Sequence, residues 1–184
     1  MTAGVIWQET SIHKSTTTME ARLAEYHAEC FGWALACCRR DRPLAEEVLQ
    51  VAYVKVLDGS ARFDGKSSLK TFLFGVIRRT AMEQRRARWL STHRLVAWFN
   101  RRTEPIPASD PEASWLKSER TRELALALAR LSTRQREVLH LVFSQDLTIA
   151  EAATVLAIST GSARRHYERG KARLRELLAG GTNR

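Results

Sequence analysis

A helix-turn-helix pattern at residues 148–178 limits the fold more than any other feature of this 184-residue chain. Thr148 and Glu151 have the spacing of a capping box, in which each side chain bonds the backbone N–H of the other residue. A helix is therefore predicted to begin directly after the threonine. Residues 157–159 break the apolar pattern, and a second helix is expected over 161–178. Two helices joined by a short turn are typical of helix-turn-helix DNA-binding motifs.

The second helix of this pattern has an apolar face and a basic face. Ala163, Tyr167 and Leu174 can face inward. The side chains on the remaining surface are Arg164, Arg165, His166, Arg169, Lys171, Arg173 and Arg175. In a major groove, the first two turns of such a helix reach base edges and phosphates. The alternative interpretation is a solvated basic helix at the end of a small domain.

Positive charge gathers in two zones of the chain. Residues 62–102 contain 11 Lys or Arg against two acids, and the residues after 160 contain seven against two. The formal net charge is +10 and the pI is near 10.2. Such an excess favours a polyanionic partner, and two zones predict two contacts on one nucleic acid.

Cysteine usage and hydropathy favour a cytoplasmic protein. The N-terminus lacks the continuous apolar core of a signal peptide, and no apolar run is long enough for membrane insertion. Cys30, Cys37 and Cys38 fit a reducing compartment better than a disulfide framework. The spacing of His27 from Cys30 and Cys37 leaves a thiolate-imidazole metal site open, although buried thiols in a helix core are the ordinary explanation. We therefore expect no metal site and no cofactor.

Apolar residues recur at helical intervals along most of the chain, and no useful strand-like alternation is present. One helix is expected from Thr17 to about residue 38, with Leu23, Tyr26, Cys30, Trp33 and Cys37 on its buried face. Two prolines within 103–109 must interrupt any helix there. The prediction is an all-α fold in which a flexible linker joins two helical domains. Its boundaries are 1–16 for a flexible N-terminal arm, 17–90 and 110–184 for the two helical domains, and 91–109 for the linker.

A Gly- and Ser-rich loop at residues 58–68 holds one aromatic side chain, Phe63, between Arg62 and Lys66. Loops of this composition are usually connectors, but a ring beside cations would also suit an unstacked base. Ser67 or Ser68 is expected to cap the next helix, whose far end is strongly basic. Its inward face is predicted to contain Leu69, Phe72, Leu73, Val76, Ile77 and Ala81. In the second domain, the side chains expected to share a core are Leu116, Leu124, Leu128 and Leu131.

Two blocks of the chain carry a more specific signal. The first contains AEEVLQVAYVKVL and RFDGKSSLKTFLFGVIRRTAMEQRRAR, and the second contains LARLSTRQREVLHLVFSQDLTIAEAATVLAISTGSARRHYERGKARLREL. In this order and around a proline-containing linker, they resemble regions 2 and 4 of sigma-70 family factors of the extracytoplasmic function (ECF) class. The resemblance covers roughly residues 26–88 and 124–178, which is most of the chain.

The resemblance implies a role for three groups of residues. The group expected to bind the clamp helices of core RNA polymerase is Glu46, Glu47, Gln50 and Tyr53. The group expected to hold minus-10 DNA and a flipped base is Arg62, Phe63, Lys66, Arg78, Arg79, Arg85 and Arg86. The recognition-helix group expected at the minus-35 element is Ser162, Arg164, Arg165, His166, Glu168, Arg169 and Lys171.

The function implied by the resemblance is transcription initiation. The chain would bind core RNA polymerase at its clamp helices and flap, recognise the minus-35 and minus-10 elements and promote melting. An anti-sigma factor is a further expected partner. The sequence departs from the family at Val51, Ser132 and Arg79. Arg79 replaces an asparagine with a phosphate-seeking cation, so the family's minus-10 sequence is not transferred to this chain.

Two other functions compete with this interpretation. A stand-alone helix-turn-helix regulator would use its first domain to dimerise or to sense a ligand, and would bind DNA without polymerase. An enzyme acting on nucleic acid would use Asp58, Asp64 and Glu83 as metal carboxylates. The chain shows no metal-ligand cluster, nucleophile–base spacing or phosphate-binding glycine loop. We therefore predict that the protein is not an enzyme and has no catalytic residues.

Overall fold

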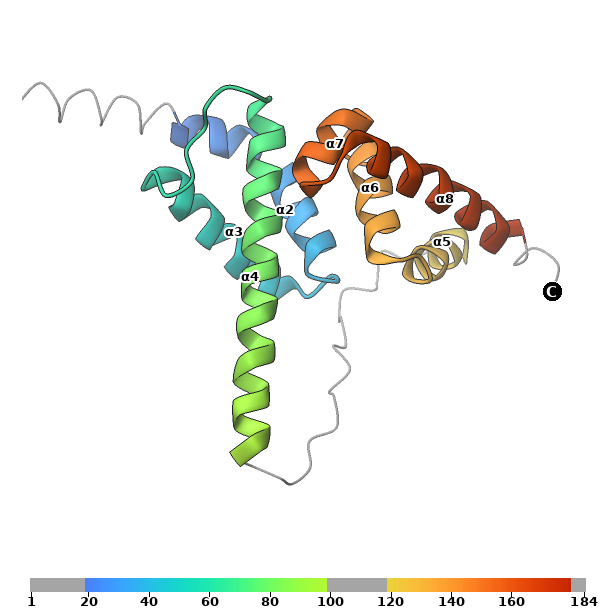
Figure 1. Ribbon diagram of the computed structural model, residues 1–184, viewed down its shortest axis with the longest axis horizontal. Helices are drawn as coiled ribbons and strands as arrows, with labels where there is room; N and C mark the ends of the chain where they lie inside the picture. Colours follow the sequence, from blue (N-terminus) through green and yellow to red (C-terminus); the bar gives the residue numbers. More distant parts are fainter. Residues whose placement is uncertain (1–18, 99–118, 180–184) are drawn as a thin grey trace, which may run out of the picture.

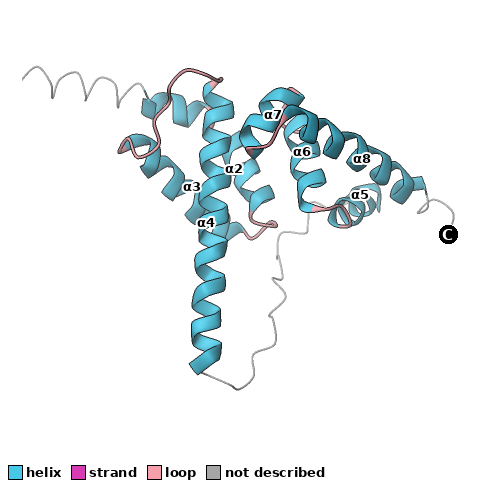
Figure 2. Ribbon diagram, viewed as in Figure 1, coloured by secondary structure: helices cyan, strands magenta, loops and turns pink. Residues whose placement is uncertain are grey.

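The computed structural model describes residues 19–98 and 119–179, and every regular element within them is a helix (Figures 1 and 2). This confirms the all-α prediction. The expected arm at 1–16 lies outside the described residues, as do the expected cap at Thr17, the proline-containing segment and Leu116. None of the described helices is both long enough and apolar enough to span a bilayer.

The first domain contains a helical segment at 19–25, followed by α2 (His27–Cys37), α3 (Arg42–Leu57) and α4 (Leu69–Trp98). A turn at Tyr26 divides the single helix that the sequence predicted. Asp41 caps α3 by accepting from Leu44 N at 3.0 Å. Ser68 caps α4, since its Oγ accepts from Thr71 N at 3.2 Å. α4 continues through the first eight residues of the expected linker.

The second domain contains α5 (Glu119–Ala129), α6 (Thr133–Phe143), α7 (Ile149–Leu156) and α8 (Thr160–Ala179). Reciprocal capping boxes begin α6 and α7, as the Ser132 and Thr148 patterns predict. Ala157 ends α7 in the left-handed conformation, with φ of 51° and ψ of 49°. This residue turns the chain into α8, so the predicted helix-turn-helix is confirmed.

Each domain buries the apolar faces of its helices. In the first domain, the Trp33 ring lies between helices, and its Nε1 donates to the Phe74 carbonyl at 3.0 Å. Phe74 is fully buried, although the predicted inward face omitted it. In the second domain Leu131 is buried, whereas Leu124 is 41% exposed. The prediction that Leu124 belongs to the core is therefore wrong.

The two domains also pack against each other. α7 lies on α4, and α6 contacts α2 (Figure 1). One continuous buried cluster joins the first domain to Val138, Leu141, Val155 and Leu156 of the second. Helical periodicity predicted the two domains, but it did not predict this interface. The face of α4 toward α7 contains Thr71 and Arg78, which a hydrophobic pattern does not mark as buried.

Candidate nucleic-acid interface

Close packing fixes the rotation of α8 within the second domain. Ala163 and Gly170 are buried on its inner face. A Cβ at Gly170 would lie 3.1 Å from both Gln135 Cβ and Leu139 Cδ1 of α6, so glycine permits this close approach. Tyr167 stacks on Phe143 with ring centroids 5.7 Å apart. The opposite face of α8 is therefore directed to the surface.

The outer face of α8 separates the predicted minus-35 residues into two groups. Arg164, Arg165, Glu168 and Arg169 are exposed, whereas Ser162, His166 and Lys171 are half-buried. Ser162 belongs to the helix cap, because its N donates to Ser159 Oγ at 3.2 Å. Lys171 Nζ lies 5.0 Å above the Tyr167 ring and 3.8 Å from Glu168. The exposed group can reach a DNA groove, and Ser162 and Lys171 make local contacts.

The loop at 58–68 is held to the first domain by its aromatic residue. Phe63 is half-buried and packs on Phe72, with ring centroids 5.3 Å apart in a tilted arrangement. Arg62 and Lys66 are exposed. Lys66 hydrogen-bonds Asp64 and lowers the pKa of that carboxyl. Phe63 therefore anchors the loop, and the exposed cations are the groups that a nucleic acid can approach directly.

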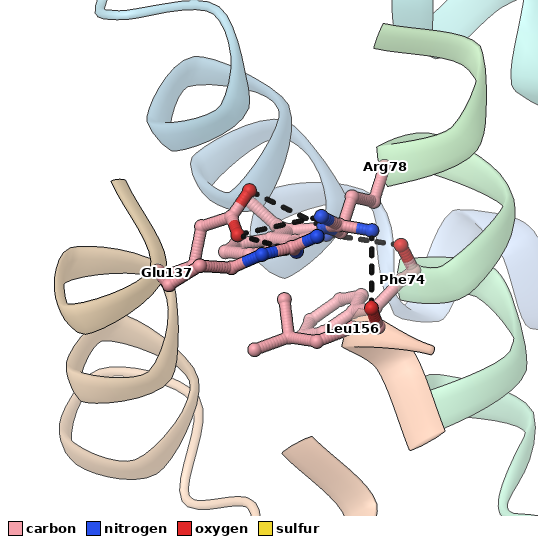
Figure 3. Close-up of polar contacts among 6 residues, drawn as sticks. Phe74, Arg78, Glu137 and Leu156 are labelled. Carbon is pink, nitrogen blue, oxygen red and sulfur yellow. Dashed lines mark hydrogen bonds and ion pairs between the residues drawn. The ribbon is translucent and has the colours of Figure 1, made fainter. Parts of the chain in front are cut away.

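Arg78 is the one predicted minus-10 residue that the structure buries, with 7% of the residue exposed. Its Nε lies 3.2 Å from Glu137 Oε1, and its Nη1 donates to the Leu156 carbonyl at 3.3 Å (Figure 3). Arg134 Nη1 also contacts Glu137, at 3.2 Å. Because the second domain covers this side of α4, Arg78 cannot contact DNA in the observed arrangement. The predicted minus-10 role of Arg78 therefore requires the two domains to move apart.

The other predicted arginines of α4 are at the surface. Arg79, Arg85 and Arg86 are exposed. Glu83 of the same helix forms an ion pair with Lys55 of α3. Among the described residues, no three or more His, Cys, Asp or Glu side chains are grouped so that they could hold a metal ion.

The predicted polymerase-binding residues of α3 do not all share one face. Glu46, Glu47 and Gln50 are exposed, and the two glutamates form surface ion pairs with Arg42 and Arg88. Tyr53 is half-buried, and its hydroxyl lies 3.4 Å from His27 Nδ1. Burial raises the pKa of this tyrosine. The side chain that continues the exposed face is instead Val54, which is 59% exposed.

Val54 is not among the residues predicted from the sequence, although its position could have indicated it. It lies four residues after Gln50, the spacing of neighbours on one helix face. An exposed valine next to carboxylates is consistent with a protein-binding surface.

All three cysteines are buried free thiols. Burial raises the pKa of Cys30 and Cys38 to about 11 and raises that of Cys37 well above the ordinary value. The thiols therefore stay protonated at neutral pH, and protonated thiols are poor nucleophiles and poor metal ligands. This agrees with the interpretation of these residues as helix-core thiols.

Comparison with known proteins identifies both blocks. Residues 23–91 match the family described as Sigma-70 region 2, and residues 127–176 match Sigma-70, region 4. The chain is 29% identical over 155 residues to the ECF RNA polymerase sigma factor SigX of Bacillus subtilis (strain 168), covering 83% of this chain and 79% of SigX.

Two solved structures share the fold. The sigma factor RpoE, in complex with the anti-sigma factor NepR from Bartonella quintana, superposes with a TM-score of 0.68 at 23% identity, covering 88% of this chain and 97% of RpoE. CnrH, in complex with the cytosolic domain of CnrY, gives 0.63 at 17% identity, covering 92% and 95%. With the two matched regions in this order and the likeness to SigX, the chain belongs to the sigma-70 family as an ECF sigma factor.

Proposed function

We propose that this ECF sigma factor binds core RNA polymerase and directs it to promoters through two DNA-binding surfaces. The observation that carries the proposal is the outer face of α8, where Arg164, Arg165, Glu168 and Arg169 are exposed. In the chain, α8 follows a capped helix, α7, and the tight turn that ends it. In this arrangement α8 enters the major groove of the minus-35 element. Arginines there can bond guanine edges or phosphates, and only the base contacts specify sequence.

The second DNA surface is the 58–68 loop together with the exposed side of α4. Arg62, Lys66, Arg79, Arg85 and Arg86 neutralise phosphates of the minus-10 strand. Melting costs stacking energy, which capture of an extruded base beside the loop offsets. No covalent chemistry is required for this step. The protein therefore acts as an initiation factor and not as an enzyme.

The third surface is the exposed face of α3, which docks on the polymerase clamp. Glu47, Gln50 and Val54 lie on it, with Glu46 beside them. Carboxylates around an apolar side chain suit a protein partner that offers cations and an apolar contact. Tyr53 lies off this face and stabilises the position of α3 through its contact with α2.

An anti-sigma factor is the further partner that we propose. The RpoE structure is a complex with an anti-sigma factor, and that of CnrH is a complex with the cytosolic domain of CnrY. In this chain the packed arrangement of the domains covers Arg78. A partner that favours this arrangement would withhold part of the minus-10 surface from DNA.

The test is promoter-dependent transcription by core polymerase with the purified chain. The double variant Glu46→Lys/Glu47→Lys should lose co-purification with core enzyme and lose initiation. Its matched control is Glu25→Lys/Glu123→Lys, which makes the same charge change at two other exposed positions and should retain both. Circular dichroism checks that both variants are folded. Core binding that is unchanged in the first variant, with DNA binding that needs no polymerase, would instead indicate a stand-alone regulator.

A further inference from the structure

A small cavity lies on the seam between the two domains. Its lining comes from the end of α2, from α4 and from the first turns of α6. The residues that line it are Trp33, Ala36, Cys37, Arg39, Arg85, Thr133, Arg136, Glu137 and His140. The cavity volume is about 20 Å³. Both domains therefore contribute side chains to one recess.

The charge of this recess is unbalanced. Arg39, Arg85 and Arg136 approach it from three different elements. Glu137 is the only carboxylate among the lining residues, and it already pairs with Arg78 and Arg134. Burial is the main cause that lowers the pKa of His140 to about 4, so this ring is neutral at pH 7 and adds no charge of its own. The three arginines thus face a recess whose only acid has other partners.

The fold adds two features to the cationic side of the recess. Arg39 and Arg40 both adopt left-handed backbone conformations, with φ of 56° and 65°. Such conformations cost free energy in residues other than glycine, so consecutive examples require support from the surrounding structure. Arg40 also lies close enough to His140 to contribute to its lowered pKa. The turn after α2 therefore places positive charge at the mouth of the cavity.

The size of the cavity decides which anion fits. A space of about 20 Å³ holds one or two water molecules and is too small for a nucleotide base and ribose. A carboxylate at the end of an Asp or Glu side chain can enter while its backbone stays outside. Arginine pairs with carboxylates through short, charge-assisted and often bidentate hydrogen bonds.

We propose that this cavity binds a carboxylate side chain from an acidic segment of a partner protein. One bound carboxylate would contact arginines of both domains and hold them in the packed arrangement. The proposal deepens the proposed function, on which it rests, by assigning a place and a chemistry to an inhibitory partner. The partner segment carries Asp or Glu at its centre, and its neighbouring acids meet the arginines at the rim.

The test uses hexaglutamate peptide as the probe and isothermal titration calorimetry as the measurement. The variant Arg39→Asn/Arg136→Gln removes two cavity cations and keeps every residue assigned to DNA or polymerase binding. Its control, Arg22→Gln/Arg122→Gln, makes the same charge change at exposed positions that do not line the cavity. We expect one peptide per chain, at least tenfold weaker binding in the cavity variant and less than twofold weaker binding in the control.

The Trp33 resonance and inorganic phosphate provide two further tests of the site. Peptide should move the indole resonance of Trp33 in the unmodified chain, which tests the site even if the cavity variant fails to fold. Equal weakening in both variants, or an unmoved Trp33 resonance, would overturn the proposal. Inorganic phosphate binding as tightly as the peptide, at the same arginines, would also overturn it in favour of a small-anion site.

Transcription separates this proposal from the proposed function. Without peptide, the cavity variant should initiate within twofold of the unmodified chain. With peptide, initiation by the unmodified chain should fall and initiation by the cavity variant should persist. Equal inhibition of both would show that the peptide only competes with DNA. A chain that binds peptide at the cavity but never initiates with core polymerase would refute the proposed function and leave the site standing.

Discussion

The two basic helices of this protein, α4 and α8, have similar chemistry and different exposure. α8 presents Arg164, Arg165 and Arg169 to solvent on a face that no described helix covers. α4 presents Arg79 and Arg86 in the same way, but its Arg78 is buried against the second domain. The difference shows that a basic pattern on a helix identifies candidate contacts but cannot tell which of them a neighbouring domain covers.

Burial also changes what an arginine does. On α8, an exposed guanidinium is available to phosphates and bases. On α4, the Arg78 guanidinium bonds Glu137 and the carbonyl that ends α7, inside the helix-turn-helix (Figure 3). One residue of the first domain thus stabilises the turn between α7 and α8 of the second.

The largest effect is expected from Glu137→Ala. Removing the carboxylate leaves Arg78 buried without its ion-pair partner, which costs about 3–5 kcal/mol unless the domains separate and hydrate the guanidinium. Urea unfolding should report the lost stability, and small-angle scattering should report a larger radius of gyration. The matched control is Glu176→Ala, because Glu176 pairs with Arg173 at the surface and is worth no more than about 1 kcal/mol. If both variants behave alike, the buried ion pair does not hold the domains together.

The next effect is a pH dependence of the packed arrangement. His140 stacks on Trp33, with ring centroids 5.5 Å apart, and burial together with Arg40 lowers its pKa from 6.5 to about 4. The chain with separated or unfolded domains takes up a proton near pH 6.5, and the packed chain does not. The packed arrangement is therefore fully stabilised above pH 6.5 and loses up to about 3 kcal/mol as the pH falls toward 4.

Urea unfolding between pH 7.5 and pH 4.5 measures this effect. His140→Gln should remove most of the slope, because glutamine takes up no proton in this range. The titratable and charged groups that share the cavity or its mouth with His140 are Cys37, Arg39, Arg40, Arg85, Arg136 and Glu137. A slope that survives the substitution would place the titrating group elsewhere.

Local sequence patterns predicted the features that depend on near neighbours. The capping boxes at Ser132 and Thr148 are in place, and so is the turn after α7, because each involves residues within a few positions of one another. The exposed face of α8 follows from the same periodicity. The assignment of these surfaces to promoter and polymerase remains a prediction. It depends on partners that the chain alone does not contain.

Features that depend on distant residues were not predicted. The stacking of Trp33 on His140 joins positions more than a hundred residues apart, and the contact of Arg78 with Leu156 spans 78. Gly170 has no distinctive local pattern, and its role became visible only where α6 approaches α8. In each case the deciding partner lies on another helix. Helical periodicity contains no information about which helices meet.

A substitution on the exposed face of α8 should have a smaller effect than one that breaks the buried ion pair of Arg78 on α4. Arg165→Ala should weaken promoter-specific transcription more than non-specific DNA retention, since a good base contact contributes about 1–3 kcal/mol of discrimination. Run-off transcription and filter binding on random-sequence DNA give the two quantities. Arg173→Ala is the control on the same helix, because Arg173 pairs with Glu176 at 2.9 Å. Equal losses in both assays would make Arg165 a phosphate contact.

The smallest effect is expected at the turn between α7 and α8. Ala157 has a φ of 51°, a left-handed conformation that costs free energy for every residue with a Cβ. Ala157→Gly should relieve this strain and raise stability by about 0.5–1 kcal/mol, despite the greater chain entropy of glycine when unfolded. Calorimetry should show a higher Tm.

The position of Ala157 makes this substitution a test of coupling as well as of strain. Ala157 directly follows Leu156, whose carbonyl accepts from Arg78, but its own side chain is exposed. The strain belongs to the second domain whether or not that domain packs on α4. Glycine should therefore raise the unfolding temperature and leave the radius of gyration unchanged. A change in the radius of gyration would mean that the conformation of this turn is coupled to domain separation through the contact of Arg78 with the Leu156 carbonyl.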